Sequence, residues 1–124
     1  MHMTKTRLNN HEFGMLGEDL AVNFLVSEGL EIIVRNWRVR EGEIDIIAKD
    51  DSGTIHFCEV KTRRSLSAGD PLEAISPSKS LKLQKLALMW MMQSGLWGHE
   101  FQIDCMGIVL TDSSHTIDFR PHVL

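Results

Sequence analysis

A chain of 124 residues is long enough for one hydrophobic core and too short for two, which predicts a single domain over residues 1–124. Hydrophobic residues make up 43% of the chain and charged residues 24%, so the composition excludes a disordered or fibrous protein. A net charge of −4 excludes a protein that coats nucleic acid through its overall charge. Any contact with nucleic acid therefore needs a local basic patch.

The sequence also lacks the features of a membrane or secreted protein. No apolar run approaches the roughly 18–20 residues of a membrane-spanning helix, and the polar start MHMTKTRLNN has no apolar signal segment. Cys58 and Cys105 each lie in an apolar run rather than in a paired spacing such as C-x-x-C, which predicts two buried free thiols. We expect a cytoplasmic protein with no membrane partner.

The first predicted element is a helix over residues 11–28, which Gly29 ends. Its apolar residues recur at three- and four-residue steps, the pattern of an amphipathic helix. These residues are Leu16, Leu20, Ala21, Phe24 and Leu25. Residues 30–40 follow as a predicted strand, in which apolar and charged residues alternate imperfectly.

The strongest strand signals are residues 43–49 (EIDIIAK) and 54–62 (TIHFCEVKT). The turn-forming residues between them, DDSG at 50–53, predict that the two runs pair as a hairpin. After the hairpin, residues 63–70 are polar and predict a loop. Pro71 opens a short apolar stretch that predicts a helical turn.

Ser76 and Pro77 form a helix-start signal, and residues 78–93 contain no further glycine or proline. The predicted buried face of this helix consists of Leu83, Ala87, Trp90 and Met91. Residues 101–110 predict a strand, and residues 116–120 predict an edge strand that Pro121 ends. The order αβββαββ predicts an α/β fold, a mixed central sheet flanked by helices.

A candidate site arises from the predicted hairpin. Side chains two residues apart on a strand share a face, so Glu59 and Lys61 lie side by side, with Cα atoms about 7 Å apart. Asp45 comes within reach of Glu59 across the hairpin if the register suits. Two carboxylates at this distance repel each other unless a cation neutralises them. The three side chains therefore predict a site for a hard divalent ion, Mg²⁺ or Mn²⁺.

The chemistry that such a site predicts is hydrolysis of a phosphodiester bond. Asp45, Glu59 and the backbone carbonyl of Val60 supply enough oxygen ligands, and the remaining positions stay open for phosphate and water. Lys61 would orient the attacking water or offset charge on the phosphate. The alternative is a surface salt bridge worth under about 1 kcal/mol. The apolar surroundings, IDIIA and FCEV, favour the site.

Basic residues in the flanking segments are candidates for binding phosphate groups. The candidate nucleic-acid-binding residues are Arg38, Arg63, Lys79 and Lys82. The alternative is that these residues are scattered solvated charges, together with Arg35, Arg40, Arg64 and Lys85.

The ordered motifs resemble those of the PD-(D/E)xK nuclease superfamily. GEIDIIA at residues 42–48, followed by EVKTR at 59–63, resembles in particular the YraN family of small bacterial proteins related to Holliday-junction resolvases. Further positions fit the family's pattern, namely Gly14, Gly17, Glu18 and Ala21 in the first helix, Asn36 and Arg38 in an N-x-R element, and Gly69, Pro71, Lys79, Ala87 and Asp104. The chain departs from the family at Gln102, where the family tends to have arginine.

The resemblance implies a restriction-endonuclease-like core in which Asp45 and Glu59 hold the metal and Lys61 is the catalytic lysine. Glu18 resembles an additional acidic ligand of resolvase-like relatives. Asp104 either completes the acidic site or accepts a structural hydrogen bond from a neighbouring arginine, and the structural role is favoured. The implied activity is that of a Mg²⁺- or Mn²⁺-dependent endonuclease acting on DNA, in particular branched or structured DNA. A homodimer is left open. The alternative is a non-catalytic nucleic-acid-binding or adaptor module.

Overall fold

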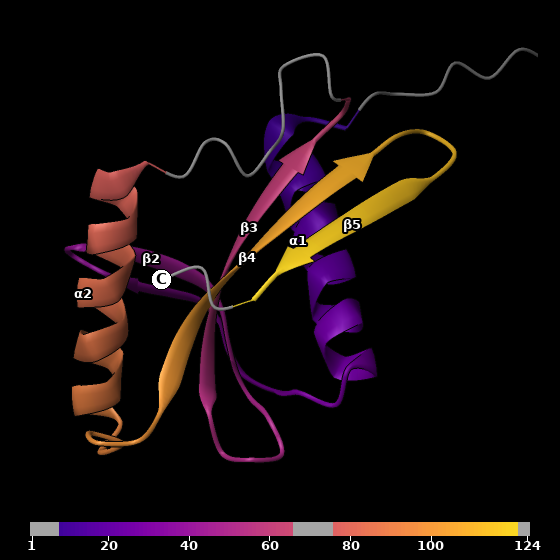
Figure 1. The fold of residues 1–124 in the computed structure, drawn as a ribbon. Coiled ribbons are helices and arrows are strands. Elements are labelled where there is room, and N and C mark those ends of the chain that lie inside the picture. The colour runs from indigo at the N-terminus through magenta and orange to yellow at the C-terminus, as the bar shows by residue number, and fades with distance from the viewer. Residues whose placement is uncertain (1–7, 66–75, 122–124) are drawn as a thin grey trace, which may run out of the picture.

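The computed structural model describes residues 8–65 and 76–121, which form two helices and five strands in the predicted order αβββαββ (Figure 1). The elements are α1 (Asn10–Ser27), β1 (Glu31–Val39), β2 (Gly42–Lys49), β3 (Ile55–Arg63), α2 (Pro77–Gln93), β4 (Phe101–Leu110) and β5 (His115–Arg120). These bounds differ from the predicted ones by no more than one residue. The loop and helical turn predicted after Arg63 fall largely on residues 66–75, which lie outside the described residues.

The strands form one mixed sheet in the order β1-β2-β3-β4-β5. β3 and β4 are parallel, because α2 lies between them in the chain, and the other neighbouring pairs are antiparallel. β5 lies at one edge of the sheet, so the predicted edge strand and the predicted mixed sheet are both confirmed. Cys58 and Cys105 are buried free thiols, as predicted. Neither described helix is long and apolar enough to cross a membrane.

The helices cover opposite faces of this sheet (Figure 1). Because side chains alternate along a strand, Phe57 points into the core under α2, whereas its neighbour Cys58 points into the core under α1. The residues of α2 in the first core are Leu83, Leu86, Ala87, Trp90 and Met91. This list contains the whole predicted buried face and adds Leu86.

α1 starts at a capping box, in which the side chain of Asn9 accepts a hydrogen bond of 2.8 Å from the backbone of Glu12. Its buried face runs along the four-residue row Phe13, Gly17, Ala21 and Leu25. The prediction for Leu16 was wrong, because this side chain is 40% exposed. Consecutive residues of a helix are about 100° apart around its axis. Because Gly17 faces the sheet, its neighbour Leu16 points away from the sheet.

Strands β2 and β3 pair along only part of their length, and this places the candidate site. Their register runs from Lys49 opposite Ile55 to Ile46 opposite Cys58, where it stops. Beyond that point β2 remains paired with β1, and β3 remains paired with β4. Figure 1 shows the two strands diverging, β2 towards α2 and β3 towards the start of α1. The fork opens at the next residues, Asp45 and Glu59.

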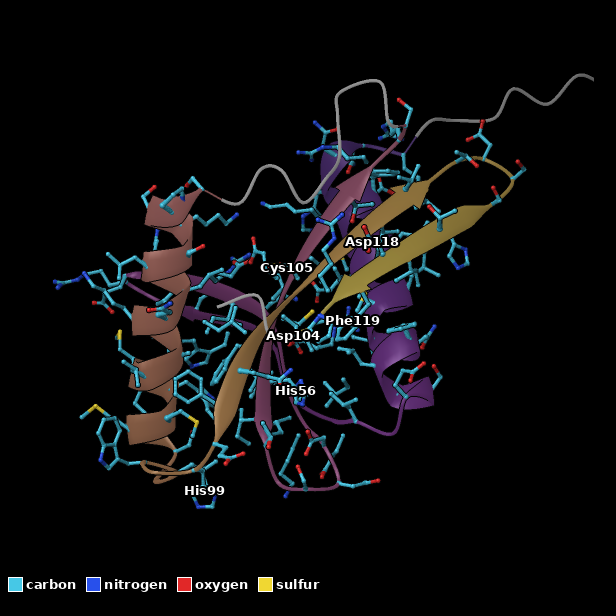
Figure 2. All side chains as sticks on the ribbon, in the orientation of Figure 1. His56, His99, Asp104, Cys105, Asp118 and Phe119 are labelled. Atoms are coloured by element: carbon cyan, nitrogen blue, oxygen red, sulfur yellow. The ribbon has the colours of Figure 1, made fainter. Side chains whose placement is uncertain are left out.

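A buried polar cluster holds the other end of the same hairpin. His56 lies between two carboxylates, with Nδ1 at 2.6 Å from Asp104 and Nε2 at 2.8 Å from Asp50 in the hairpin turn. Figure 2 shows His56 and Asp104 close together inside the protein. The amide of Gln102 donates a further hydrogen bond of 2.8 Å to Asp104. Asp104 thus contacts His56 and Gln102, which fits the favoured structural role.

This cluster predicts a pH-dependent contribution to stability. The hydrogen bond to Asp104 raises the pKa of His56, burial opposes this shift, and Asp50 adds to it. The hydrogen bond from His56 holds the pKa of Asp50 below its ordinary value. The contribution of His56 is therefore complete below its unfolded pKa of about 6.5 and is lost as the pH rises through the raised folded value. The contribution of Asp50 is lost below about pH 4.

We therefore expect the difference in unfolding free energy between wild type and His56→Gln to be largest near pH 5–6 and to shrink towards pH 9. Urea denaturation at a series of pH values measures this difference, and the subtraction removes the contributions of groups that do not interact with His56. His99→Gln is the matched control, because His99 is exposed. A difference that does not change with pH would show that folding leaves the pKa of His56 unshifted, and a difference that shrinks towards low pH would show that His56 is neutral in the folded protein.

Candidate metal and catalytic site

The three residues of the predicted site line one cavity of about 350 Å³ between β2, β3 and α2. Glu59 and Lys61 share the strand face that α2 covers, as their spacing requires. The last pair between β2 and β3 joins Ile46 and Cys58. One step further along the same register, Asp45 would lie opposite Glu59. The fork between the strands therefore brings Asp45, Glu59 and Lys61 together.

Asp45 is a poorly solvated carboxyl group. Its Oδ2 accepts a hydrogen bond of 2.8 Å from the backbone amide of Val60. Burial and the negative charge of Glu59 nevertheless raise the pKa of Asp45 to about 8, because they outweigh this hydrogen bond. The protonated form of Asp45 is therefore more favoured than in an ordinary aspartate, and a nearby cation would oppose this shift.

Glu59 is buried, with 7% of its surface exposed, and it binds two lysines through one oxygen. Lys61 Nζ lies 3.3 Å from Oε1, and Lys79 Nζ lies 2.7 Å from the same atom. Burial and the neighbouring Lys79 lower the pKa of Lys61, and the charge of Glu59 opposes this shift only in part. The site thus contains a second lysine beside the predicted one.

Sequence reasoning placed Lys79 among the phosphate-binding residues and did not connect it with Glu59. The two residues lie on different elements, so strand periodicity says nothing about their distance. The available signal was the position of Lys79 in the first turn of α2, because a cation is disfavoured near the positive end of a helix dipole. A carboxylate near Lys79 offsets this unfavourable position.

The donor set fits a hard divalent ion of the Mg²⁺ type. Asp45 and Glu59 offer carboxylate oxygens to the same cavity, which Val60 also lines. Asp45 accepts its hydrogen bond from the backbone of Val60 and forms no ion pair with a lysine or arginine of the described residues. The same residues contain no group of three or more His, Cys, Asp or Glu side chains suited to an ion. The two carboxylates and the carbonyl of Val60 suit Mg²⁺ better than Zn²⁺, because Mg²⁺ needs few protein ligands and keeps several waters.

A second, larger cavity of about 910 Å³ lies on the α1 side of the same fork. Asp45, Glu43 and Val60 line both cavities, so the two spaces meet at Asp45. Arg38 and Arg63, two of the predicted phosphate-binding residues, line the larger cavity. The other two, Lys79 and Lys82, line the smaller one. The four predicted basic residues thus flank Asp45 from both sides.

Glu18 lies in the larger cavity, where residues of β1 hold its carboxylate. Its Oε1 accepts hydrogen bonds of 3.1 Å from Arg35 and 2.9 Å from Asn36. Asn36 adopts a left-handed backbone conformation with φ of 54°, which asparagine tolerates better than most residues. The N-x-R element therefore positions Glu18 through Asn36, while its Arg38 forms an ion pair with Glu43.

Two solved structures are similar to this chain at low sequence identity. One is a repair endonuclease from Pyrococcus abyssi, with 16% identity, a TM-score of 0.49, and coverage of 88% of this chain and 42% of that chain. The other is the EndoMS-dsDNA2 complex, with 17% identity, a TM-score of 0.49, and coverage of 83% and 38%. The chain spans less than half the length of either solved protein.

Much closer relatives share its sequence. A UPF0102 protein of Nocardia farcinica is 44% identical over 99 residues, which cover 79% of this chain and 76% of the relative. A UPF0102 protein of Trichlorobacter lovleyi is 42% identical over 114 residues, or 91% and 90% of the two chains. The profile of the uncharacterised protein family UPF0102 matches residues 17–108, which include all three residues of the candidate site. The chain therefore belongs to the UPF0102 family, the YraN family that its motifs predicted.

Proposed function

We propose that this protein is a metal-dependent endonuclease that hydrolyses phosphodiester bonds in DNA. The observation that carries the proposal is the cavity at the fork, where Asp45, Glu59 and Lys61 meet and Asp45 lacks a cationic partner among the described residues. Asp45, Glu59 and the carbonyl of Val60 would hold Mg²⁺ or Mn²⁺. When bound, the ion supplies a Lewis acid for the phosphate and lowers the pKa of a coordinated water.

Glu59, Lys61 and Asp45 would have different roles in the reaction. Glu59 holds Lys61 at 3.3 Å, which keeps the ammonium group beside the oxygen atoms that would bind the ion. From there Lys61 orients the attacking water and stabilises negative charge that develops on the phosphate. A bound ion would favour the ionised form of Asp45, because its positive charge would offset the repulsion from Glu59.

DNA would reach this site along the two cavities that meet at Asp45. Arg63 and Arg38 would contact phosphate groups on the α1 side, and Lys79 and Lys82 would do so on the α2 side. Glu18 would act as an additional acidic ligand on the α1 side. Contacts of this kind follow the backbone and do not read bases, which suits a substrate recognised by shape. We propose branched or structured DNA, and a homodimer that would present two such sites.

A nuclease assay tests the proposal directly. Purified protein with Mn²⁺ or Mg²⁺ is incubated with linear, flapped and four-way DNA, and cleavage of at least one of these substrates is expected. Calorimetry with Mn²⁺ alone separates the proposal from the adaptor alternative, because an adaptor needs no ion site. Failure to bind Mn²⁺ and to cleave any substrate would favour a non-catalytic nucleic-acid-binding module.

Binding of DNA is expected to weaken as salt is added, because each phosphate contact releases counterions. Arg63→Ala and Lys82→Ala should each weaken binding to every DNA sequence and reduce the salt slope by about one. Fluorescence anisotropy in EDTA, from low to moderate salt, measures both effects without cleavage. Lys49→Ala, at the far end of β2, is the control for loss of one charge. An affinity that stays flat with salt would contradict a phosphate-binding surface.

A further inference from the structure

Lys79 spans the smaller cavity from α2 to β3. The helix is capped by Ser76, whose hydroxyl accepts a hydrogen bond of 3.2 Å from the backbone amide of Lys79. The backbone of Lys79 is thereby fixed, and its side chain extends to Glu59, where Nζ lies 2.7 Å from Oε1. This contact is shorter than the 3.3 Å contact of Lys61 with the same oxygen.

The positive charges of the cavity are distributed unevenly. Both ammonium groups lie at one oxygen of Glu59, and within the described ranges Asp45 has no lysine or arginine as an ion-pair partner. A divalent ion between the two carboxylates would bring two more positive charges next to these ammonium groups. Like charges at such distances repel strongly in a partly buried site. This repulsion favours the departure of one lysine from Glu59 when an ion binds.

Lys79 is better placed to leave than Lys61. Lys61 lies on the same strand as Glu59, two residues away, so its position follows that of the carboxylate. The side chain of Lys79 comes from another element and is 31% exposed. Its flexible four-carbon stem can carry the ammonium group to the open side of the cavity, where Lys82 also lies. A phosphate group of the substrate would be its new partner there.

We propose that Lys79 is an exchangeable counter-ion of Glu59, which balances the carboxylate in the metal-free protein and moves to a substrate phosphate when a divalent ion binds. The inference rests on the proposed function and deepens it. It makes Lys79 a positioning residue of the metal site as well as a phosphate contact. It also means that Lys79 takes the place of the cation at Glu59 until a divalent ion binds.

Titration with Mn²⁺ in a calorimeter tests the exchange without any nuclease activity. Lys79→Met keeps an unbranched side chain that ends one atom short of Nζ and removes the charge, so the ion no longer competes with an ammonium group. The affinity for Mn²⁺ is expected to increase by about tenfold or more, the value of one charge-assisted hydrogen bond. Lys79→Arg keeps the competing cation and should resemble wild type, as should Lys49→Met, which loses a charge away from the site.

Thermal unfolding with and without Mn²⁺ separates an exchangeable contact from a structural one. Lys79→Met is expected to lower Tm in EDTA, where Glu59 loses its nearer partner. In saturating Mn²⁺ this deficit should shrink or reverse, because the tighter ion binding stabilises the variant more than wild type. A permanent structural tie would lower Tm equally in both conditions, and that result would overturn the proposal.

The outcomes also separate this inference from the proposed function. Mn²⁺ binding by wild type that Lys79→Met leaves unchanged or weakens would overturn the exchange alone. Mn²⁺ binding by Lys79→Met but not by wild type would support the exchange in its strongest form. Absence of Mn²⁺ binding from both proteins would overturn the metal site of the proposed function and the exchange with it.

Discussion

Replacing Lys61 with alanine is expected to slow DNA hydrolysis by about a hundredfold or more while leaving Mn²⁺ binding intact or tighter. The reason is the position of its Nζ, 3.3 Å from Glu59, beside the proposed ion without being one of its ligands. Removing the ammonium group takes away the group that orients water and stabilises charge in the transition state. It also removes a cation that competes with the ion for Glu59.

The contrast with Asp45→Ala makes this prediction specific. Asp45 is a proposed ligand, so its loss should abolish both Mn²⁺ binding and cleavage. Single-turnover cleavage rates and calorimetric affinities for the two variants separate the roles. A structural salt bridge would make both changes lower stability without separating metal affinity from rate. Wild-type rates in Lys61→Ala would show that another residue is the catalytic lysine.

Replacing Gly17 with alanine is expected to destabilise the protein by about 3 kcal/mol, the upper end of the cost of overpacking. A Cβ atom at Gly17 would lie 2.0 Å from Thr62 Oγ1 and 2.9 Å from Thr62 Cβ. Thr62 is β-branched and held in β3, so neither residue can move aside without shifting the helix. Denaturation in urea measures the loss in the free energy of unfolding.

Gly14→Ala is the matched control for this prediction. Gly14 lies in the same helix, and a Cβ atom there would meet nothing within 4 Å. The variant should gain up to about 1 kcal/mol, because alanine is the better helix former. Combining Gly17→Ala with Thr62→Ala should recover part of the lost stability, since the clash is with the Thr62 side chain. Equal effects of Gly17→Ala and Gly14→Ala on the free energy of unfolding would contradict close packing at Gly17.

This packing also affects the candidate site. Gly17 allows α1 to approach β3 closely, and the next residue, Glu18, then reaches Arg35 and Asn36 on β1. A larger residue at position 17 would push Glu18 away from these partners. Of the two glycines of α1 that fit the family's pattern, Gly17 therefore contacts the sheet, whereas Gly14 faces open space.

The sequence alone determined the features that depend on local backbone geometry. Apolar spacing, turn residues and helix-start and helix-end signals located the seven elements of the described residues, because each of these signals follows from local backbone geometry. The same two-residue period placed Glu59 and Lys61 on one face of β3. The ordered motifs identified the family, which the profile match and the relatives confirm.

Only the tertiary structure decided which elements meet and at what distance. The register of the hairpin and its end at Ile46 and Cys58 bring Asp45 to Glu59, and the sequence left that register open. The 2.7 Å contact of Lys79 with Glu59 depends on how α2 docks on the sheet. Periodicity relates residues within one element, whereas contacts between elements depend on how whole surfaces pack. That is why Gly17 rather than Leu16 faces the sheet, and why the site contains a lysine that no motif spacing linked to it.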